Sequence, residues 1–496
     1  MTSSTDAVAT ARRFWHRSLD DYAGLLGSGA GREEPLKTKV YGDAKRYPLP
    51  ARVPYELGPL SAALRPAAGP SLQTTAGWGR LLRYAYGLSR SHLGPLAMWP
   101  LHRTVASARC LFPVELYAWL PGDGERPAGL FYYDPAHHHL VLIREGDWRF
   151  RLAATGAEAV FVLTSLFIKT AFRYGDYAYR LCVQEAGLVA GNLLMVAGAL
   201  GLTGRVSHRF PDAAVQRLLG LTAPGEAPLM IISVGSGSGE AASRTAPAAV
   251  ADGYVSPLDL RDCPELLALD SASRLTDATQ PELPAPGGGP ATRTADMPAE
   301  RDPDLADVLA ARESGGPVFN SVARPADPAV LRWLATHADG THTSDASHGD
   351  PLVRSYVVVN ALDGVAPGLY RLAGGTADRV AAGHLAGPLM QVQPDWPPPI
   401  NFHSANLVVY VSADPEAAMA LFGARSYRIL HHEAGIVAQR VSVMCTAHGL
   451  TARVHNGYLA RPLREALGLP ENQTVLFQIA VGTARPTGVY RLPISF

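Results

Sequence analysis

Histidine and cysteine are the first side chains to consider for chemistry, because both can bind a metal ion. Residues 137–139 and 431–432 are runs of histidine, and the four cysteines lie far apart. A zinc site needs ligand pairs at short, defined spacing. No C-x-x-C pair and no second ligand pair at helical spacing accompanies these runs. We therefore expect solvated or packing histidines, buried cysteines and no metal site.

An internal repeat runs through the sequence. Residues 179–206 and 427–454 align without a gap, and further blocks on either side repeat in the same order. The matched positions are Tyr179/Tyr427, Arg180/Arg428, Glu185/Glu433, Gly187/Gly435 and Gly201/Gly449, with residues 114–130 and 356–369 upstream and 228–235 and 475–482 downstream. Because order is preserved across all three blocks, the chain contains two diverged copies of one unit.

The elements that must position these residues can be inferred from the hydrophobic pattern. Residues 117–120 and 355–360 are typical of buried strands, and residues 129–143 predict a hairpin. Residues 185–201 are apolar nearly all round, which predicts a central buried helix. We expect an α+β fold with two tandem domains, whose long helices pack across a pseudo-two-fold axis as in a symmetric dimer.

The repeat divides the 496 residues into four segments. We place domain 1 at residues 60–236 and domain 2 at residues 304–496, with an N-terminal extension at residues 1–59. Residues 237–303 are rich in Ala, Pro, Gly, Thr and Asp, which predicts a loosely ordered linker.

Composition excludes several classes of partner. Lys+Arg and Asp+Glu are both 44, so no net charge points to nucleic acid or to an anionic membrane. No apolar signal core occurs in residues 1–13, and no run of 18 apolar residues predicts a membrane span. We expect a cytoplasmic protein.

Residues 103–115, RTVASARCLFPVE, resemble the R-x-x-P-S-A-G-x-L-Y-P-x-E motif of SagB-type dehydrogenases in the nitroreductase superfamily. Two further stretches fit the same family: Tyr132, Asp134 and Pro135 match its GLYhYDP segment, and Tyr179-Arg180, Glu185-Ala-Gly187 and Asn192 match its long helix. Together with the repeats, the resemblance covers about two thirds of the chain. Two tandem nitroreductase-like domains forming an intrachain pseudo-dimer are the implied architecture.

Three departures from the family pattern affect the implied site. Ala106 replaces a proline and Arg109 replaces a glycine. A Lys-Tyr pair is usual before the long helix, and here the pair is Arg173-Tyr174. Because arginine does not readily lose its proton, it cannot act there as a lysine base would.

The resemblance implies FMN as cofactor and the oxidation of peptide thiazolines and oxazolines to thiazoles and oxazoles. The implied partners are an azoline-containing precursor peptide, a cyclodehydratase and O₂ as electron acceptor. In this superfamily FMN lies at a dimer interface, where an Arg-x-Ser segment of one subunit holds the phosphate and a Ser-Ala loop comes from the other. A homodimer remains an alternative to the intrachain arrangement.

The two copies have lost complementary parts of such a site. Domain 2 keeps Arg312 and Ser314, whereas residues 64–69 of domain 1 lack both side chains. Domain 1 keeps Ser107-Ala108 and Arg173-Tyr174, whereas domain 2 has residues 345–347 and Leu421-Phe422. This pattern predicts one composite site per chain.

The resemblance assigns roles to the residues of that site. Arg312 and Ser314, with Arg485, hold the phosphate, because the planar fork of arginine suits it. The remaining cofactor contacts are Arg103, Ser107 and Ala108 from domain 1, and Asn456 and Gly457 from domain 2. Tyr174 and Arg173 line the substrate side, with Tyr174 as the base candidate. An ordinary solvated helix residue is the alternative interpretation of Arg312.

The repeated glutamates and arginines have a structural interpretation. Glu185 and Glu433 are expected in helix caps or buried ion pairs, and Arg180 and Arg428 are expected to pair with them. Two other functions stay open for the whole chain. One is an FMN enzyme that reduces nitro or enone compounds with NAD(P)H, and the other is a non-catalytic scaffold that binds a leader peptide.

Overall fold

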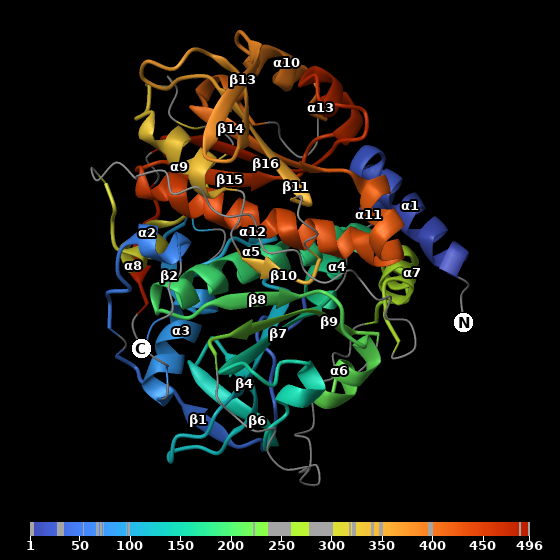
Figure 1. The fold of residues 1–496 in the computed structure, drawn as a ribbon, viewed down its shortest axis with the longest axis vertical. Coiled ribbons are helices and arrows are strands. Elements are labelled where there is room, and N and C mark those ends of the chain that lie inside the picture. Colours follow the sequence, from blue (N-terminus) through green and yellow to red (C-terminus); the bar gives the residue numbers. More distant parts are fainter. Residues whose placement is uncertain are drawn as a thin grey trace.

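The structure is a computed structural model that describes most of the chain. It describes residues 4–26, 34–52, 54–65, 69, 72, 74–95, 97, 100–221, 224–236, 259–276, 301–316, 319, 324–338, 342–346, 351–394, 400–485 and 488–494. Within these residues the chain forms two α+β domains, and a pair of long helices lies between their sheets (Figure 1).

Domain 1 is built on a sheet with the strand order β1-β6-β5-β4-β7-β9-β8-β10. Its strands are β1 (Arg46–Pro48), β4 (Val114–Leu120), β5 (Gly129–Asp134), β6 (His139–Glu145), β7 (Ala159–Leu166), β8 (Gly204–Ser207) and β9 (Glu226–Val234). Its helices are α2 (Leu60–Leu64), α3 (Thr75–Tyr86), α4 (Ile168–Tyr174), α5 (Ala178–Ala199) and α6 (Asp212–Leu219).

Domain 2 repeats this plan, with the strand order β13-β12-β11-β14-β16-β15. Its strands are β11 (Val353–Val359), β12 (Gly368–Ala373), β13 (Thr376–Ala382), β14 (Leu407–Ala413), β15 (Thr451–His455) and β16 (Thr474–Gly482). Its helices are α8 (Leu305–Ala311), α9 (Ala329–His337), α10 (Ala386–Gln391), α11 (Pro415–Phe422), α12 (Ser426–Ala447) and α13 (Ala460–Ala466). Strands β4 to β9 and β11 to β16 take the same places in their sheets, which confirms the predicted tandem fold.

The two central helices, α5 and α12, approach each other closely at a pair of repeated glycines. A Cβ atom on Gly187 would lie 2.4 Å from the His432 carbonyl oxygen and 2.8 Å from the Gly435 Cα. Glycine is therefore required there, because any side chain would push the helices apart. Both helices are followed by a left-handed glycine, Gly201 at φ 79° and Gly449 at φ 74°, which is a common way to end a helix.

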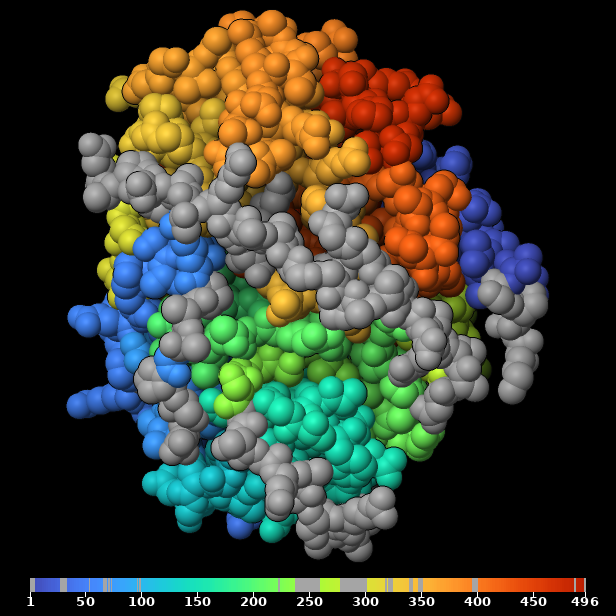
Figure 2. All heavy atoms as spheres, in the orientation of Figure 1, coloured from blue at the N-terminus to red at the C-terminus, as the bar shows by residue number. Residues whose placement is uncertain are grey.

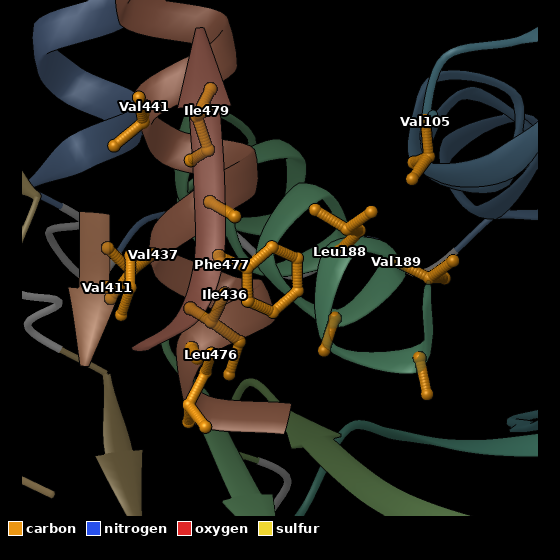
Figure 3. Packing of buried hydrophobic residues seen from close by; sticks show 14 of the residues in the cluster. Val105, Leu188, Val189, Val411, Ile436, Val437, Val441, Leu476, Phe477 and Ile479 are labelled. Atoms are coloured by element: carbon orange, nitrogen blue, oxygen red, sulfur yellow. The ribbon is translucent and has the colours of Figure 1, made fainter. Parts of the chain in front are cut away.

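One hydrophobic core continues from domain 1 through the helix pair into domain 2. Figure 3 shows Leu188 of α5, Val437 and Val441 of α12, and Leu476 and Ile479 of β16 in this cluster. The stretch Ile168–Ala199 is long and apolar enough to span a membrane, but 94% of its most apolar window is buried inside the protein. The contact between the domains is thus a shared core rather than a polar surface contact.

Two strands cross from domain 2 to domain 1. β10 (Thr343–Ser344) adds in parallel to β8 at the edge of the first sheet. β17 (Tyr490–Pro493), close to the C-terminus, pairs with β2 (Leu88–Leu93), which also pairs with β3 (Leu101–Arg103). These strands tie the two copies together at both ends of the interface.

The predicted N-terminal extension and linker both contain folded parts. α1 (Ser4–Asp20) lies beside α11 (Figure 2), where Arg12 Nη2 is 2.7 Å from Glu416 Oε2. β1 joins the sheet of domain 1, so the boundary predicted at residue 60 is too late. α7 (Pro264–Ala272) buries Leu266 and Leu269, so the loose linker is wrong for residues 259–276; residues 237–258 and 277–300 lie outside the described residues.

Candidate active site

The repeated arginines of α5 and α12 clamp the two domains together. Arg428 Nη1 lies 3.0 Å from Asp212 Oδ1, and its Nη2 lies 3.3 Å from Asp270 Oδ1. Arg180 reaches from domain 1 to domain 2 and donates to the Tyr458 hydroxyl at 2.9 Å. All of these side chains are buried. The arginines therefore stabilise the fold as predicted, but their partners are not the repeated glutamates.

Arg312 of domain 2 is buried against domain 1. It is the C-cap of α8 and is 3% exposed. Its Nε donates to the Thr104 carbonyl at 2.8 Å, and its carbonyl accepts from Arg90 Nη1 at 2.8 Å. Its Nη1 has no hydrogen-bond partner among the described residues. Burial, and then the charge of Arg90, lowers the pKa of Arg312 to about 9. Arg312 is thus no solvated helix residue, but a buried cation suited to an anionic ligand.

Arg103 lies next to Arg312. The Arg312 Nη2 atom is 3.5 Å from the Arg103 carbonyl oxygen. The Arg103 guanidinium lies 4.4 Å from the ring centroid of Tyr86 and 4.6 Å from that of Phe112. Its Nε and Nη1 lack hydrogen-bond partners within the described part of the chain. Two buried arginines, one from each domain, therefore lie at this interface, where the Arg312 guanidinium faces the backbone carbonyl of Arg103.

The loop at residues 107–112 of domain 1 has an unusual backbone. Arg109, Cys110 and Phe112 have φ angles of 50°, 52° and 48°, which place three non-glycine residues in the left-handed region. Each such residue costs on the order of 1 kcal/mol or more, and such strain is typical of functional sites. The Ser107 Oγ accepts from the Phe112 amide at 2.9 Å and closes the loop, and Ala108 packs against the core.

Tyr174, at the end of α4, faces this loop. Its hydroxyl accepts a hydrogen bond from Arg109 Nε at 3.2 Å, and its side chain is half-buried. Arg173 is exposed and has no such contact with Tyr174. The guanidinium beside the phenol is therefore that of Arg109, which sequence reasoning noted only as a departure from glycine. The left-handed backbone of Arg109 is a conformation that glycine, the residue of the SagB-type motif at this position, would adopt without strain.

A buried network of acids and bases lies beneath the loop. The Tyr86 hydroxyl donates to Glu185 Oε1 on α5 at 3.1 Å. Lys169 Nζ lies 2.5 Å from Glu115 Oε1. Burial raises the pKa of Glu185 to about 7, opposed by its hydrogen bond from Ser107 and by Arg103. Glu185 is thus no ion-pair residue of the predicted kind, because it binds hydroxyl groups.

Of the other site residues predicted in domain 2, two lie at the interface with α5 and two are exposed. Asn456 Nδ2 donates to Gln184 Oε1 at 2.7 Å, which brings it against α5 one residue from Glu185. Gly457 is buried beside it, as a ring contact through the backbone would need. Ser314 and Arg485 are exposed, and the structure gives neither a side-chain contact with Arg312.

The pseudo-equivalent interface has different chemistry. Glu433, the counterpart of Glu185, lies 2.7 Å from His208 Nε2 and 2.9 Å from His342 Nε2, and accepts from Ser344 Oγ at 3.1 Å. Despite its burial, the charge of His342 and the hydrogen bond from His208 hold the pKa of Glu433 well below its usual range. The hydrogen-bonding positions of this carboxylate are therefore filled by side chains of the protein itself, as expected if the second site has been lost.

The histidine runs serve packing for the most part, and three of the four cysteines are buried. His431 is buried and stacks on Tyr427 with ring centroids 4.3 Å apart, and His432 stacks on His208 at 5.4 Å. These two are packing histidines and are not solvated, whereas the side chain of His137 is exposed and paired with Asp134. Among the described residues, no group of three or more His, Cys, Asp and Glu side chains could hold a metal ion.

Comparison with known proteins identifies the domains. The model described as "Nitroreductase family" matches residues 123–236 and 357–483. The chain therefore carries the nitroreductase-family domain twice, once in each copy. Domains of this family generally bind FMN.

Individual relatives agree with this assignment. A protein of Methanocaldococcus jannaschii named "Putative nitroreductase MJ1384" is 29% identical over 142 residues, which cover 27% of this chain and 70% of the relative. The crystal structure of "a putative nitroreductase from anabaena variabilis" is 19% identical, with a TM-score of 0.72 over 96% of this chain and 99% of that chain. This likeness shows that the tandem fold occurs within one other chain. A chain of the "E. coli Microcin synthetase McbBCD complex with truncated pro-MccB17 bound" is 19% identical, covering 48% of this chain and 95% of that chain, with a TM-score of 0.29, at which the likeness supports no argument.

Proposed function

We propose that this chain is an FMN-dependent dehydrogenase that oxidises the thiazoline or oxazoline rings of a precursor peptide to thiazoles or oxazoles. We further propose that both copies together form one flavin site per chain. The placement of Arg312 is the observation that supports the proposed flavin site. Arg312 is a buried cation of domain 2 that donates to the Thr104 carbonyl, three residues before Ser107 in domain 1, and its Nη1 has no hydrogen-bond partner among the described residues.

The residues present suit FMN at this place. Arg312 would hold the phosphate group, and the exposed Ser314 follows it in the same segment. Ser107, Ala108 and the buried Gly457 would approach the rest of the cofactor from opposite domains. When bound, FMN supplies a two-electron acceptor for the hydride of the substrate, and O₂ takes these electrons afterwards.

The substrate side is assigned to Tyr174 and Arg109. Oxidation of an azoline removes one hydride and one proton from the ring, so the site needs a proton acceptor. The Tyr174 oxygen, which accepts a hydrogen bond from Arg109 Nε at 3.2 Å, is the acceptor for that proton. The azoline class itself rests on the resemblance of residues 103–115 and of the long helix to SagB-type dehydrogenases. A cyclodehydratase would supply such a substrate.

The reduction of nitro or enone compounds with NAD(P)H is the second candidate function, favoured by the name of the family and of its relatives. Anaerobic mixing separates the two candidates. An azoline peptide should bleach the flavin absorption of the purified protein within a turnover, while NAD(P)H alone should bleach it much more slowly. Bleaching by NAD(P)H without any response to azoline peptides would reject the dehydrogenase.

The flavin site is tested by Arg312→Ala, with Arg440→Ala as a matched control. Arg440 on α12 is also buried, has an unpartnered Nε and has its pKa lowered to about 10 by burial, but it lies near Glu433 at the other interface. Loss of a charged phosphate contact should cost roughly 1.5–3 kcal/mol. FMN should therefore dissociate on the order of 10- to 100-fold more readily from Arg312→Ala only. Equal flavin retention in both folded variants would reject the assignment.

A further inference from the structure

Lys169 is a buried lysine on α4, the short helix that ends at Tyr174. An ammonium group has three hydrogens to donate and no acceptor. Three oxygen atoms surround this one: Glu115 Oε1 at 2.5 Å, the Lys37 carbonyl oxygen at 2.8 Å and the Phe112 carbonyl oxygen at 3.4 Å. Each hydrogen therefore has its own acceptor, so the group is held as an ammonium ion and has no lone pair with which to take a proton.

Two of these acceptors belong to the end of the strained loop at residues 107–112 and to the strand that follows it. Phe112 is the last residue of the loop, and Glu115 is the second residue of β4. Left-handed backbone at non-glycine residues, which this loop has at three positions, persists only where surrounding contacts hold it. At Phe112 the amide donates to Ser107 Oγ at 2.9 Å, and the carbonyl accepts from Lys169. Lys169 is thus one of the contacts that fix the end of the loop.

The position of Tyr174 depends on the same helix. α4 has seven residues, and a helix of that length is not stable without tertiary contacts. Lys169 is its second residue, and Tyr174 is its last, with a hydroxyl that accepts from Arg109 Nε of the loop at 3.2 Å. The loop and the helix are therefore joined both by the Arg109–Tyr174 contact at the substrate side and by the Lys169 ammonium in the protein interior. A shift of α4 against the loop would separate the Tyr174 oxygen from Arg109.

Domain 2 provides an internal comparison at the same positions. The glycines that end α4 and α11 have the same φ of 56°, and their alignment places Ala417 at the position of Lys169. In the sheet register, Arg354 of β11 takes the place of Glu115 of β4, and its side chain is exposed. Both members of the buried pair are therefore missing from the copy in which Phe422 takes the place of the proposed base.

We propose that Lys169 is a positioning residue of the active site, which holds α4 and the adjoining loop so that Tyr174 meets Arg109. Lys169 acts through the Glu115 carboxylate and the Phe112 carbonyl, and it takes no proton from the substrate. This inference rests on the proposed function, because the residue that it positions is the proposed base.

A second buried lysine of domain 1 offers a matched control. Lys39 lies 2.6 Å from Glu226 Oε2 and donates to the Tyr117 hydroxyl, in contacts that involve neither α4 nor the loop. The double variants Lys169→Met/Glu115→Gln and Lys39→Met/Glu226→Gln each remove one buried ammonium together with the charge of its partner. Neither variant leaves an unpaired buried charge, which would be far more destabilising than the loss of the whole pair.

Amide hydrogen exchange of the protein without FMN tests the positioning itself. The amides of residues 108–112 and of the last turn of α4 should exchange about tenfold faster, or more, in Lys169→Met/Glu115→Gln than in the unmodified protein. In Lys39→Met/Glu226→Gln the same amides should exchange at the unmodified rate. Equal exchange in the two double variants would overturn the proposal, whatever reaction the protein catalyses.

Single-turnover flavin reduction by an azoline peptide tests whether Lys169 acts through Tyr174. Lys169→Met/Glu115→Gln should lower the rate at saturating peptide by about tenfold or more, with the half-saturating peptide concentration unchanged. In a Tyr174→Phe background the same change should lower the rate by less than about twofold, because residues that act through one group are not additive. Lys39→Met/Glu226→Gln should leave the rate unchanged in both backgrounds.

An equal loss of rate from Lys169→Met/Glu115→Gln in both backgrounds would overturn the positioning role, because a general loss of structure does not depend on the Tyr174 hydroxyl. Absence of flavin reduction in the unmodified protein would instead reject the proposed function. The exchange experiment would then still decide whether Lys169 holds the loop against α4.

Discussion

Arg109 Nε lies 3.2 Å from the hydroxyl oxygen of Tyr174, although the two residues are 65 positions apart in the chain. The contact joins the strained Ser107 loop to the end of α4. It also places a permanent positive charge beside the phenol proposed as the base. The sequence predicts Arg173 beside Tyr174, but the Arg173 side chain is exposed. The substrate side of the site is therefore assembled by tertiary structure rather than by a neighbouring pair in the sequence.

Tyr174→Phe should leave FMN bound and slow azoline oxidation by about 10²- to 10⁴-fold, the usual contribution of a general base. The structural reason is that phenylalanine keeps the ring but removes the oxygen that faces Arg109. Single-turnover flavin reduction by an azoline peptide measures the effect. Phe422 occupies the corresponding position of domain 2, so Phe422→Tyr serves as a control that should change nothing. An unchanged rate in Tyr174→Phe would remove the hydroxyl from the mechanism.

Arg109→Gly should separate stability from activity. Glycine adopts the φ of 50° without strain, so the variant should unfold with a free energy about 1 kcal/mol higher than the unmodified protein, less any lost packing. Turnover should fall, because the hydrogen bond to Tyr174 is lost. Thermal unfolding and single-turnover kinetics test the two effects on the same samples. A variant that gains stability and keeps full turnover would show that Arg109 has no part in the reaction.

Glu185 and Glu433 should give stability opposite dependences on pH. Burial raises the pKa of Glu185 to about 7 from its ordinary value of 4.5, so the folded protein binds a proton that the unfolded chain has already lost. Its contribution to stability is therefore greatest below pH 4.5 and falls as pH rises to about 7, by about 3 kcal/mol in all. Denaturant unfolding of Glu185→Gln should lack this decline.

The sign is reversed for Glu433. Its pKa lies well below the ordinary range, so its contribution is present above pH 4.5 and is lost as pH falls through the folded-state pKa. Glu433→Gln should cost about 1–3 kcal/mol at neutral pH, because it weakens the hydrogen bonds of a buried carboxylate. If both glutamine variants showed the same pH profile of stability, the assigned difference between the copies would be wrong.

The sequence predicts the fold well because the repeat constrains it twice. The sequence predicts a buried helix at residues 185–201 and a second such helix in the other copy; α5 and α12 are these helices, and α5 begins seven residues earlier than predicted. The strand expected at residues 117–120 is part of β4, and the strand expected at residues 355–360 overlaps β11, which ends at Val359. Hydrophobic periodicity determines such elements locally, so tertiary contacts change only their ends.

The side-chain partners were less predictable. Arg180 and Glu185 are five positions apart on one helix, which turns their side chains about 140° away from each other. The arginine therefore meets the opposite domain while the glutamate turns toward Tyr86. Helical geometry was a signal that could have excluded the pair. The crossings of β10 and β17 and the contact of Arg109 depend on distant strands, and no local pattern indicates them.

The central claim is one composite flavin site per chain, and the flavin content of the folded protein tests it most directly. After reconstitution with excess FMN and removal of the unbound cofactor, the ratio of FMN absorbance to chain concentration should be one. Arg312→Ala should lower this ratio strongly, and Arg440→Ala should not. Two flavins per chain, or one flavin that survives in Arg312→Ala, would contradict the account.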